Sequence, residues 1–175
     1  MSSFLLILLA IASRVLPHTW WNFTAVGGSL LYFGARRPLR QAIVPLVLMA
    51  CTDYYLTVYA YNYAFHVQGY LLTWVWYAAA ILLGRILLRD QVSLARGGAA
   101  TLLSATSFFA ISNYAVWAGS GMYPHSIAGL AACYTAALPF YRNDLISTAL
   151  VLGVAFGLPA LARHLLTPEK HHVSA

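Results

Sequence analysis

Long apolar runs, separated by short breaks that contain polar residues, proline or glycine, dominate the pattern of this chain. A membrane-spanning helix needs roughly 20 apolar residues, and fewer where the helix is short or partly shielded from lipid. Six runs approach that length, and each predicts a helix that crosses a membrane. They cover residues 3–16, 23–35, 41–56, 71–88, 97–117 and 145–166. The pattern therefore predicts an all-α integral membrane protein with a bundle of six transmembrane helices.

A further apolar run, residues 126–138, has a different interpretation. Its 13 residues are few for a crossing, and Pro139 follows it directly. Such a segment is typical of a re-entrant or interfacial helix. Counting it as a crossing would also move Arg163 and Lys170 to the other side of the membrane. We therefore predict a short re-entrant or interfacial helix near 126–138, which the stretch 139–144 separates from the last crossing.

The composition supports a membrane environment. Of the 175 residues, 61% are hydrophobic and 8% are charged, whereas a soluble domain carries about 25% charged residues. Because so few charges cannot cover a globule in water, we expect the lipid bilayer to be the main surroundings of the protein. A single transmembrane domain, 1–166, then accounts for nearly the whole chain, and a polar tail, 167–175, follows it.

The basic residues predict the orientation. The formal net charge is +6, and most basic residues gather in three regions of the chain. These are Arg36, Arg37 and Arg40, then Arg85, Arg89 and Arg96, and finally Arg163 with Lys170. With six crossings all three regions share one side, which the positive-inside rule assigns to the cytoplasm. We therefore predict a multi-pass inner (cytoplasmic) membrane protein with both termini in the cytoplasm, and no nucleic-acid partner.

The opposite, outer ends of the predicted helices collect polar side chains, which are candidate ligand-binding residues. They are His18, Asn22, Asp53, Tyr59, Asn62, His66, Asn113 and Arg142. An ionisable group at membrane depth is costly unless it is paired or faces a cavity. Asp53 and Arg142 could pair in an empty cavity and exchange that pairing for a polar ligand. A structural ion pair that joins two helices is an equally good interpretation.

Other polar groups at this face have competing interpretations. Asp144, next to Asn143, is predicted to cap the last helix, since Asn and Asp accept hydrogen bonds from first-turn N–H groups. His18, His66 and His125 could together bind a divalent metal. Their spacing is long and forms no HxxxH motif, so His18 and His125 are better interpreted as rim residues. His66 could instead ligate a metal centre that the ligand itself carries.

Tyrosine is frequent in this chain, and many of its 12 tyrosines fall in the stretch 54–70. A tyrosine can stack and form a hydrogen bond at once, which suits a cavity for a flat, partly polar molecule. The sequence has no GxSxG, Walker A or HExxH motif. We therefore expect no enzymatic activity and no intrinsic cofactor. Without a nucleotide site, uphill transport would need an ion gradient or an energising partner.

Two segments carry a resemblance to known proteins: PHTWWNFTAVGGSLLYFG and ISNYAVWAGSGMYPHSIAGLAACYTAALPFYRNDL. Over residues 17–158 they resemble a bacterial family of transport proteins that is otherwise labelled as of unknown function. More distantly, the size and layout are similar to the S-components of energy-coupling-factor vitamin transporters, of the solitary cobalamin type. That similarity implies six helices, an outward-facing site, cytoplasmic termini and, as a partner, an energising ATPase and transmembrane module.

The same resemblance implies that His18, Asp53, His66 and Arg142 line the site. In the cobalamin type a cysteine ligates cobalt where this chain has His66, and imidazole is itself a cobalt ligand. Bound cobalamin is therefore one candidate substrate. The sequence as a whole favours a substrate-binding transport protein of the bacterial inner membrane that takes up a small, vitamin-like molecule. A divalent-metal carrier and a ligand-free structural or assembly protein are the alternatives.

Overall fold

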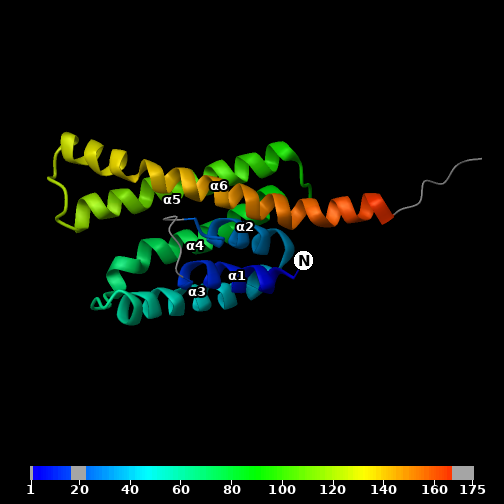
Figure 1. Cartoon of the computed structure of the whole chain (residues 1–175), viewed down its shortest axis with the longest axis horizontal. Coiled ribbons are helices and arrows are strands. Elements are labelled where there is room, and N and C mark those ends of the chain that lie inside the picture. The colour runs from blue at the N-terminus through cyan, green and yellow to red at the C-terminus, as the bar shows by residue number, and fades with distance from the viewer. Residues whose placement is uncertain (1, 17–22, 167–175) are drawn as a thin grey trace, which may run out of the picture.

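The computed structural model describes residues 2–16 and 23–166, and these form helices joined by short connections (Figure 1). The helices are α1 (Ser3–Val15), α2 (Val26–Arg36), α3 (Ile43–Tyr55), α4 (Val67–Leu88), α5 (Leu94–Gly119) and α6 (Ile127–Leu166). A 3₁₀ turn, Leu39–Gln41, leads into α3, and a π-helical turn, Leu56–Ala60, prolongs it. The prediction of an all-α chain is confirmed for the described residues, which form six helices, whereas the prediction that six helices cross a membrane is confirmed only in part.

Four of the segments are long and apolar enough to cross a membrane: Leu39–Ala60, Val67–Leu88, Leu94–Gly119 and Ile127–Leu166. The helices α1 and α2 have only 13 and 11 residues. At about 1.5 Å per residue they span roughly 20 and 16 Å, less than the roughly 30 Å of a bilayer core. The described residues therefore form a helical bundle in which four segments have the length and apolar composition of a full crossing, which indicates a membrane-embedded protein.

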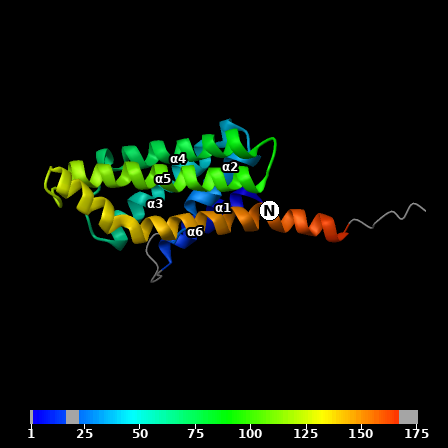
Figure 2. The same ribbon diagram turned by 90° about the horizontal axis from the view of Figure 1, so that it is seen from above.

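The last helix corrects two sequence predictions. Residues 126–138 form no separate re-entrant or interfacial helix, because Ile127–Leu166 is one continuous helix of 40 residues. Pro139 lies inside it and does not end it. Proline removes one backbone hydrogen bond and bends a helix, but packed membrane helices tolerate it, and α6 changes direction along its length (Figure 2). The stretch 139–144 thus continues the helix, and Asp144 lies in its middle and caps nothing.

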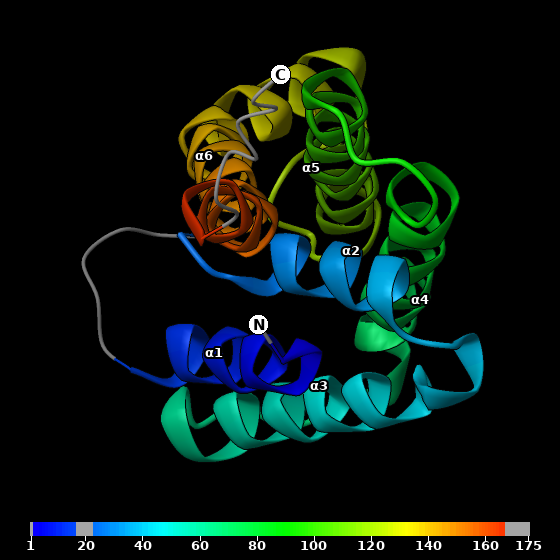
Figure 3. The same cartoon turned by 90° about the vertical axis from the view of Figure 1, so that its right-hand side faces the viewer.

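The short helix α2 lies at the centre of the bundle, between α1 on one side and α6 on the other (Figure 3). All of its residues except the last are buried. Its backbone touches that of α4, since a Cβ on Gly34 would lie 1.8 Å from the Ile81 carbonyl oxygen. In the same way a Cβ on Gly84 would lie 2.0 Å from the Leu31 carbonyl oxygen. Paired glycines of this kind permit close packing where hydrophobicity alone does not drive helix association.

The two ends of the bundle differ in charge. The N-terminal end of α1, the α2–α3 turn, the α4–α5 loop and the C-terminal end of α6 lie at one end, on the right of Figure 1. This end, the arginine-rich end, carries the basic regions that the sequence groups together: Arg36, Arg37, Arg40, Arg85, Arg89, Arg96 and Arg163. The α3–α4 and α5–α6 connections lie at the opposite end. The predicted grouping of the described arginines is therefore confirmed.

Candidate functional site

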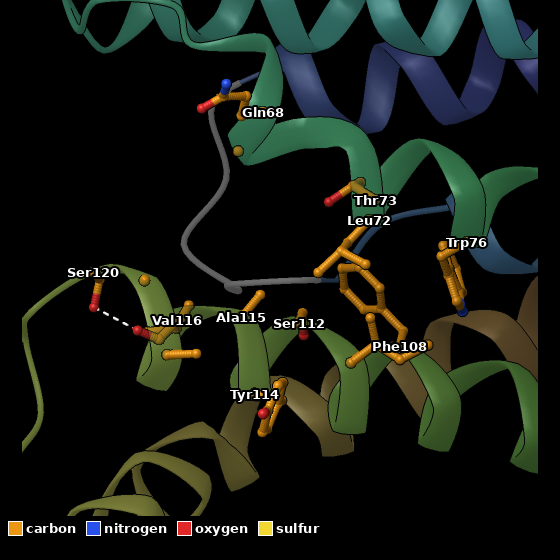
Figure 4. Close-up of a pocket in the computed structure, with 14 residues that line it drawn as sticks. Gln68, Leu72, Thr73, Trp76, Phe108, Ser112, Tyr114, Ala115, Val116 and Ser120 are labelled. Carbon is orange, nitrogen blue, oxygen red and sulfur yellow. Dashed lines mark hydrogen bonds between the residues drawn. The ribbon is translucent and has the colours of Figure 1, made fainter. Parts of the chain in front are cut away.

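A cavity of about 630 Å³ opens between the first half of α4 and the second half of α5. We call it the end cavity, because it lies toward the end opposite the arginine-rich end (Figure 1). Figure 4 shows its labelled residues on the two facing helices. The lining consists of Gln68, Gly69, Leu72, Thr73, Trp76, Phe108, Ile111, Ser112, Tyr114, Ala115, Val116, Ala118, Gly119 and Ser120. Its walls are mainly apolar, with a few amide and hydroxyl groups among them.

A second cavity of about 240 Å³, the inner cavity, adjoins the first and lies deeper among α1, α2, α3, α4, α5 and α6. It is lined by Arg14, Thr24, Val26, Gly27, Asp53, Tyr70, Thr73, Trp76, Tyr77, Phe108 and Asp144. Three of these residues, Thr73, Trp76 and Phe108, also line the end cavity. The two cavities are therefore neighbours that share one wall, and the inner one is lined by a set of buried charged groups.

The boundary between the two cavities is aromatic. The ring centroids of Trp76 and Phe108 lie 4.6 Å apart, with the ring planes tilted by 44°. Trp76 is 4% exposed, and its Nε1 donates a hydrogen bond to Ser107 Oγ at 3.1 Å. This bond and the burial hold the indole in one orientation. These two rings therefore form part of the wall that the two cavities share.

An ion pair lies in the wall of the inner cavity. Arg14 Nη2 donates to Asp53 Oδ1 at 2.6 Å, and the two side chains are 18% and 1% exposed. Trp74 Nε1 donates to Asp53 Oδ2 at 2.9 Å. The Tyr77 hydroxyl donates to Asp53 Oδ1 at 3.3 Å, and Arg14 Nη1 donates to that hydroxyl oxygen, also at 3.3 Å. Both carboxylate oxygens thus have donors, as a buried charge requires, and the network joins α1, α3 and α4.

The partner of Asp53 is therefore Arg14, and the predicted pairing with Arg142 is wrong. Arg142 is exposed on α6, whereas Asp144 on the same helix is buried. Because consecutive residues of an α-helix are turned by about 100°, two positions that are two residues apart face different sides. Arg14 lies in the last turn of α1, where the helix dipole favours a cation. An arginine at the end of an apolar helix is a signal that sequence reasoning could have used.

Asp144 is 7% exposed and lines the inner cavity from α6. Its predicted role as a helix cap is wrong, because α6 has already run through several turns before reaching it. In the described part of the chain, the ion pairs are Arg14–Asp53 and Arg89–Asp90. Asp144 belongs to neither of them. The inner cavity thus contains one carboxyl group without a cationic partner among the described residues.

Several predicted site residues lie away from both cavities. His18 and Asn22 fall outside the described residues. Tyr59, Asn62 and His66 are exposed at or near the connection between α3 and α4, and none of the three lines either cavity.

Asn113 on α5 also lies outside both linings, and its Nδ2 donates to the Phe109 carbonyl oxygen at 2.8 Å. The aromatic stretch 54–70 mostly packs on itself, with the Phe65 and Tyr70 rings stacked at 5.0 Å. Of its tyrosines, Tyr70 reaches the inner cavity.

The geometry gives no metal site in the part of the chain that is described. There, no three His, Cys, Asp or Glu side chains are close enough to hold an ion together. His66 precedes α4, whereas His125 follows α5 and lies with its ring 5.3 Å from that of Trp117. The proposed third ligand, His18, is outside the described residues.

Residues 1–170 match a family of unknown function, DUF6580, and the chain therefore belongs to that family. No curated protein and no solved structure matches the chain. What can be inferred about its role therefore rests on the two cavities and the charged groups between the helices.

Proposed function

We propose that this member of DUF6580 is a substrate-binding membrane transport protein that admits a small, vitamin-like molecule through the end cavity. The observation that carries the proposal is the pair of neighbouring cavities, one toward an end of the bundle and the other lined by buried charged groups. Cavities for small ligands are usually of about 300–1,000 Å³, with apolar walls and a few polar groups. The end cavity, at about 630 Å³, has that size and character.

The distribution of charge supports an outward-facing entrance. Lysine and arginine are enriched in the cytoplasmic loops of membrane proteins, and here the described basic loops lie at the arginine-rich end. We therefore assign that end to the cytoplasm of a bacterial cell, in the inner membrane. The end cavity then opens toward the outside, and the contact between Trp76 and Phe108 separates it from the inner cavity.

Inward release requires a rearrangement that opens this contact. Because the sequence has no nucleotide-binding motif, uphill uptake would draw on an ion gradient or on an energising ATPase and transmembrane module. The proposal does not extend to cobalamin, because His66 is exposed and lies outside the walls of both cavities. A divalent-metal carrier has no specific observation in its favour.

A ligand-free structural role is favoured by one observation, the completeness of the Arg14–Asp53 network. That network by itself can serve to join three helices. It does not require the two cavities, which a purely structural bundle would fill with side chains. The two roles are compatible, since a rigid ion pair can hold the wall of a binding site.

A tryptophan at Ala115 tests the proposal, because this residue lines the end cavity and the larger side chain would fill it. The matched control is Ala79→Trp, since Ala79 is exposed on α4 and lines neither cavity. The wild type and the control are expected to retain a co-purified small molecule in native mass spectrometry, or to be stabilised by a member of a vitamin panel. Ala115→Trp should lose both signals. Retention of the signal in Ala115→Trp, or its absence in the wild type, contradicts the proposal.

A further inference from the structure

The charge balance of the inner cavity points to the class of ligand. The cavity is lined by three charged side chains, Arg14, Asp53 and Asp144. Arg14 and Asp53 neutralise each other at 2.6 Å. Asp144, 7% exposed, has no ion-pair partner within the described residues. The Thr148 hydroxyl lies beside this carboxyl group, but a buried carboxylate without a cationic partner is still costly, so the cavity favours a cation and disfavours an anion.

The remaining walls also suit a cation. Four aromatic side chains line the cavity: Tyr70, Trp76, Tyr77 and Phe108. Their polar atoms are engaged by other residues: Tyr77 donates to Asp53, Trp76 donates to Ser107, and the Tyr70 hydroxyl bonds with that of Thr57. What these residues offer to a ligand is therefore mainly ring surface. Aromatic faces attract ammonium groups, most strongly where water is excluded.

The dimensions favour an organic cation over a metal ion. Hard metal ions take six or more oxygen ligands at short distances, whereas carbon surfaces make up much of this cavity. The inner cavity has about 240 Å³, and it shares Trp76 and Phe108 as wall residues with the mainly apolar end cavity. A molecule with a charged head and an apolar body matches these two neighbouring cavities.

We propose that the inner cavity binds the ammonium group of an organic amine, with Asp144 as its counter-ion and the surrounding aromatic rings as its cage. The body of the ligand extends past Trp76 and Phe108 toward the end cavity. The Arg14–Asp53 pair is a fixed, neutral part of the wall. This inference rests on the proposed transport function and names the substrate class of that site.

Two series of compounds, each with one carbon skeleton and three different head groups, test the proposed amine site. Benzylamine, benzyl alcohol and benzoate, together with butylamine, butanol and butyrate, are titrated against the purified full-length protein, with tryptophan fluorescence and melting temperature as readouts. We expect each amine to bind about tenfold more tightly than its alcohol, as cation–π and charge-assisted contacts imply, and the carboxylates not to bind. Asp144→Asn should abolish the preference for the amine. Asp90→Asn, on an exposed carboxylate that lines neither cavity, should preserve it.

The possible failures are distinguishable. Equal or tighter binding of the alcohols or carboxylates overturns the assignment of a cationic ligand, and so does the absence of binding by all six compounds. Stabilisation by sodium chloride alone that Asp144→Asn removes would also overturn it, because the site would then serve an inorganic ion. If Asp144→Asn does not fold, Asp144→Glu keeps the charge, and the comparison of amine with alcohol in the wild type still decides. The proposed transport function is tested separately by Ala115→Trp.

Discussion

Replacing Asp53 by alanine removes the acceptor of three donors and leaves the Arg14 guanidinium without its carboxylate. The two side chains are 1% and 18% exposed, so little water can take over the lost contacts. Removing one partner of a buried ion pair costs about 3–5 kcal/mol, because the other charge stays buried. Since domains are stable by about 5–15 kcal/mol, we expect Asp53→Ala to lose a large share of the free energy of unfolding.

A double-mutant cycle separates the pair from its surroundings. Combining Arg14→Met with Asp53→Leu replaces both charges by apolar side chains of similar length. Replacements of this kind are often neutral or stabilising, whereas each single change leaves one charge unpaired. The double variant should therefore be more stable than Asp53→Leu alone, with a coupling energy of about 2 kcal/mol or more between the two sites.

The assay is denaturant unfolding in detergent micelles, followed by tryptophan fluorescence and circular dichroism. Asp90→Ala is the control, because its exposed carboxylate lies 3.8 Å from Arg89 Nε and exposed pairs contribute little. The reasoning is refuted if Asp53→Ala is as stable as Asp90→Ala. It is also refuted if the two single effects add up in the double variant.

Three further changes have defined outcomes. Gly34→Ala should lower the free energy of unfolding by about 1–3 kcal/mol or more, because the added Cβ would meet the backbone of α4. Gly97→Ala, whose Cβ would lie in open space, should not lower it. Equal unfolding midpoints of the two variants would contradict this prediction. Asp144→Asn should unfold at the same or a higher denaturant concentration than the wild type, because the amide removes a buried charge; a clear loss would show that Asp144 has a structural partner. With both native cysteines replaced, a membrane-impermeant maleimide should label Ser120→Cys but not Gln91→Cys in intact cells, and the reverse labelling would invert the proposed orientation.

The apolar helical segments and the grouping of most arginines could be predicted because a bilayer imposes both. A bilayer requires long apolar runs whose backbone groups bond within the helix, and loops rich in arginine mark one side. Both the apolar runs and the arginine-rich loops can be identified from short stretches of sequence. Predicting them therefore does not require knowing which helices are neighbours in the fold. For the same reason the described arginines of the three basic regions lie together at one end of the structure, as the sequence predicts.

The helix α6 is harder to predict, because Pro139 changes how the residues on either side of it are interpreted. A proline after 13 apolar residues indicates a break in a soluble protein, yet Pro139 lies within α6. A break at Pro139 would place Asp144 at the start of the next helix, and this is why the sequence predicts a capping role for it. The buried position of Asp144 depends on how α6 packs against the other helices, which the local pattern does not contain.

The site itself was predictable only in part. Asp53 was identified from its cost at membrane depth, and it does line the inner cavity. Its partner cannot be chosen from the sequence, because only the packing of the helices brings Arg14, and not Arg142, to Asp53. The walls of the end cavity come largely from small or apolar residues such as Leu72 and Ala115. Such residues carry no chemical signal in a sequence.

The central position of α2 has a consequence for the order in which the protein is built. At 11 residues α2 is too short to enter a bilayer as an independent span, and it is covered by other helices of the same chain. One of them, α4, touches it through Gly34 and Gly84, and it is synthesised only after α3 is complete. A nascent chain that ends before α4 therefore offers α2 its contact with α1 but lacks the close backbone contact at Gly34 and Gly84. We expect α2 to reach its place late, when α4 and α6 close around it, so that the middle of the molecule is the last part to be assembled.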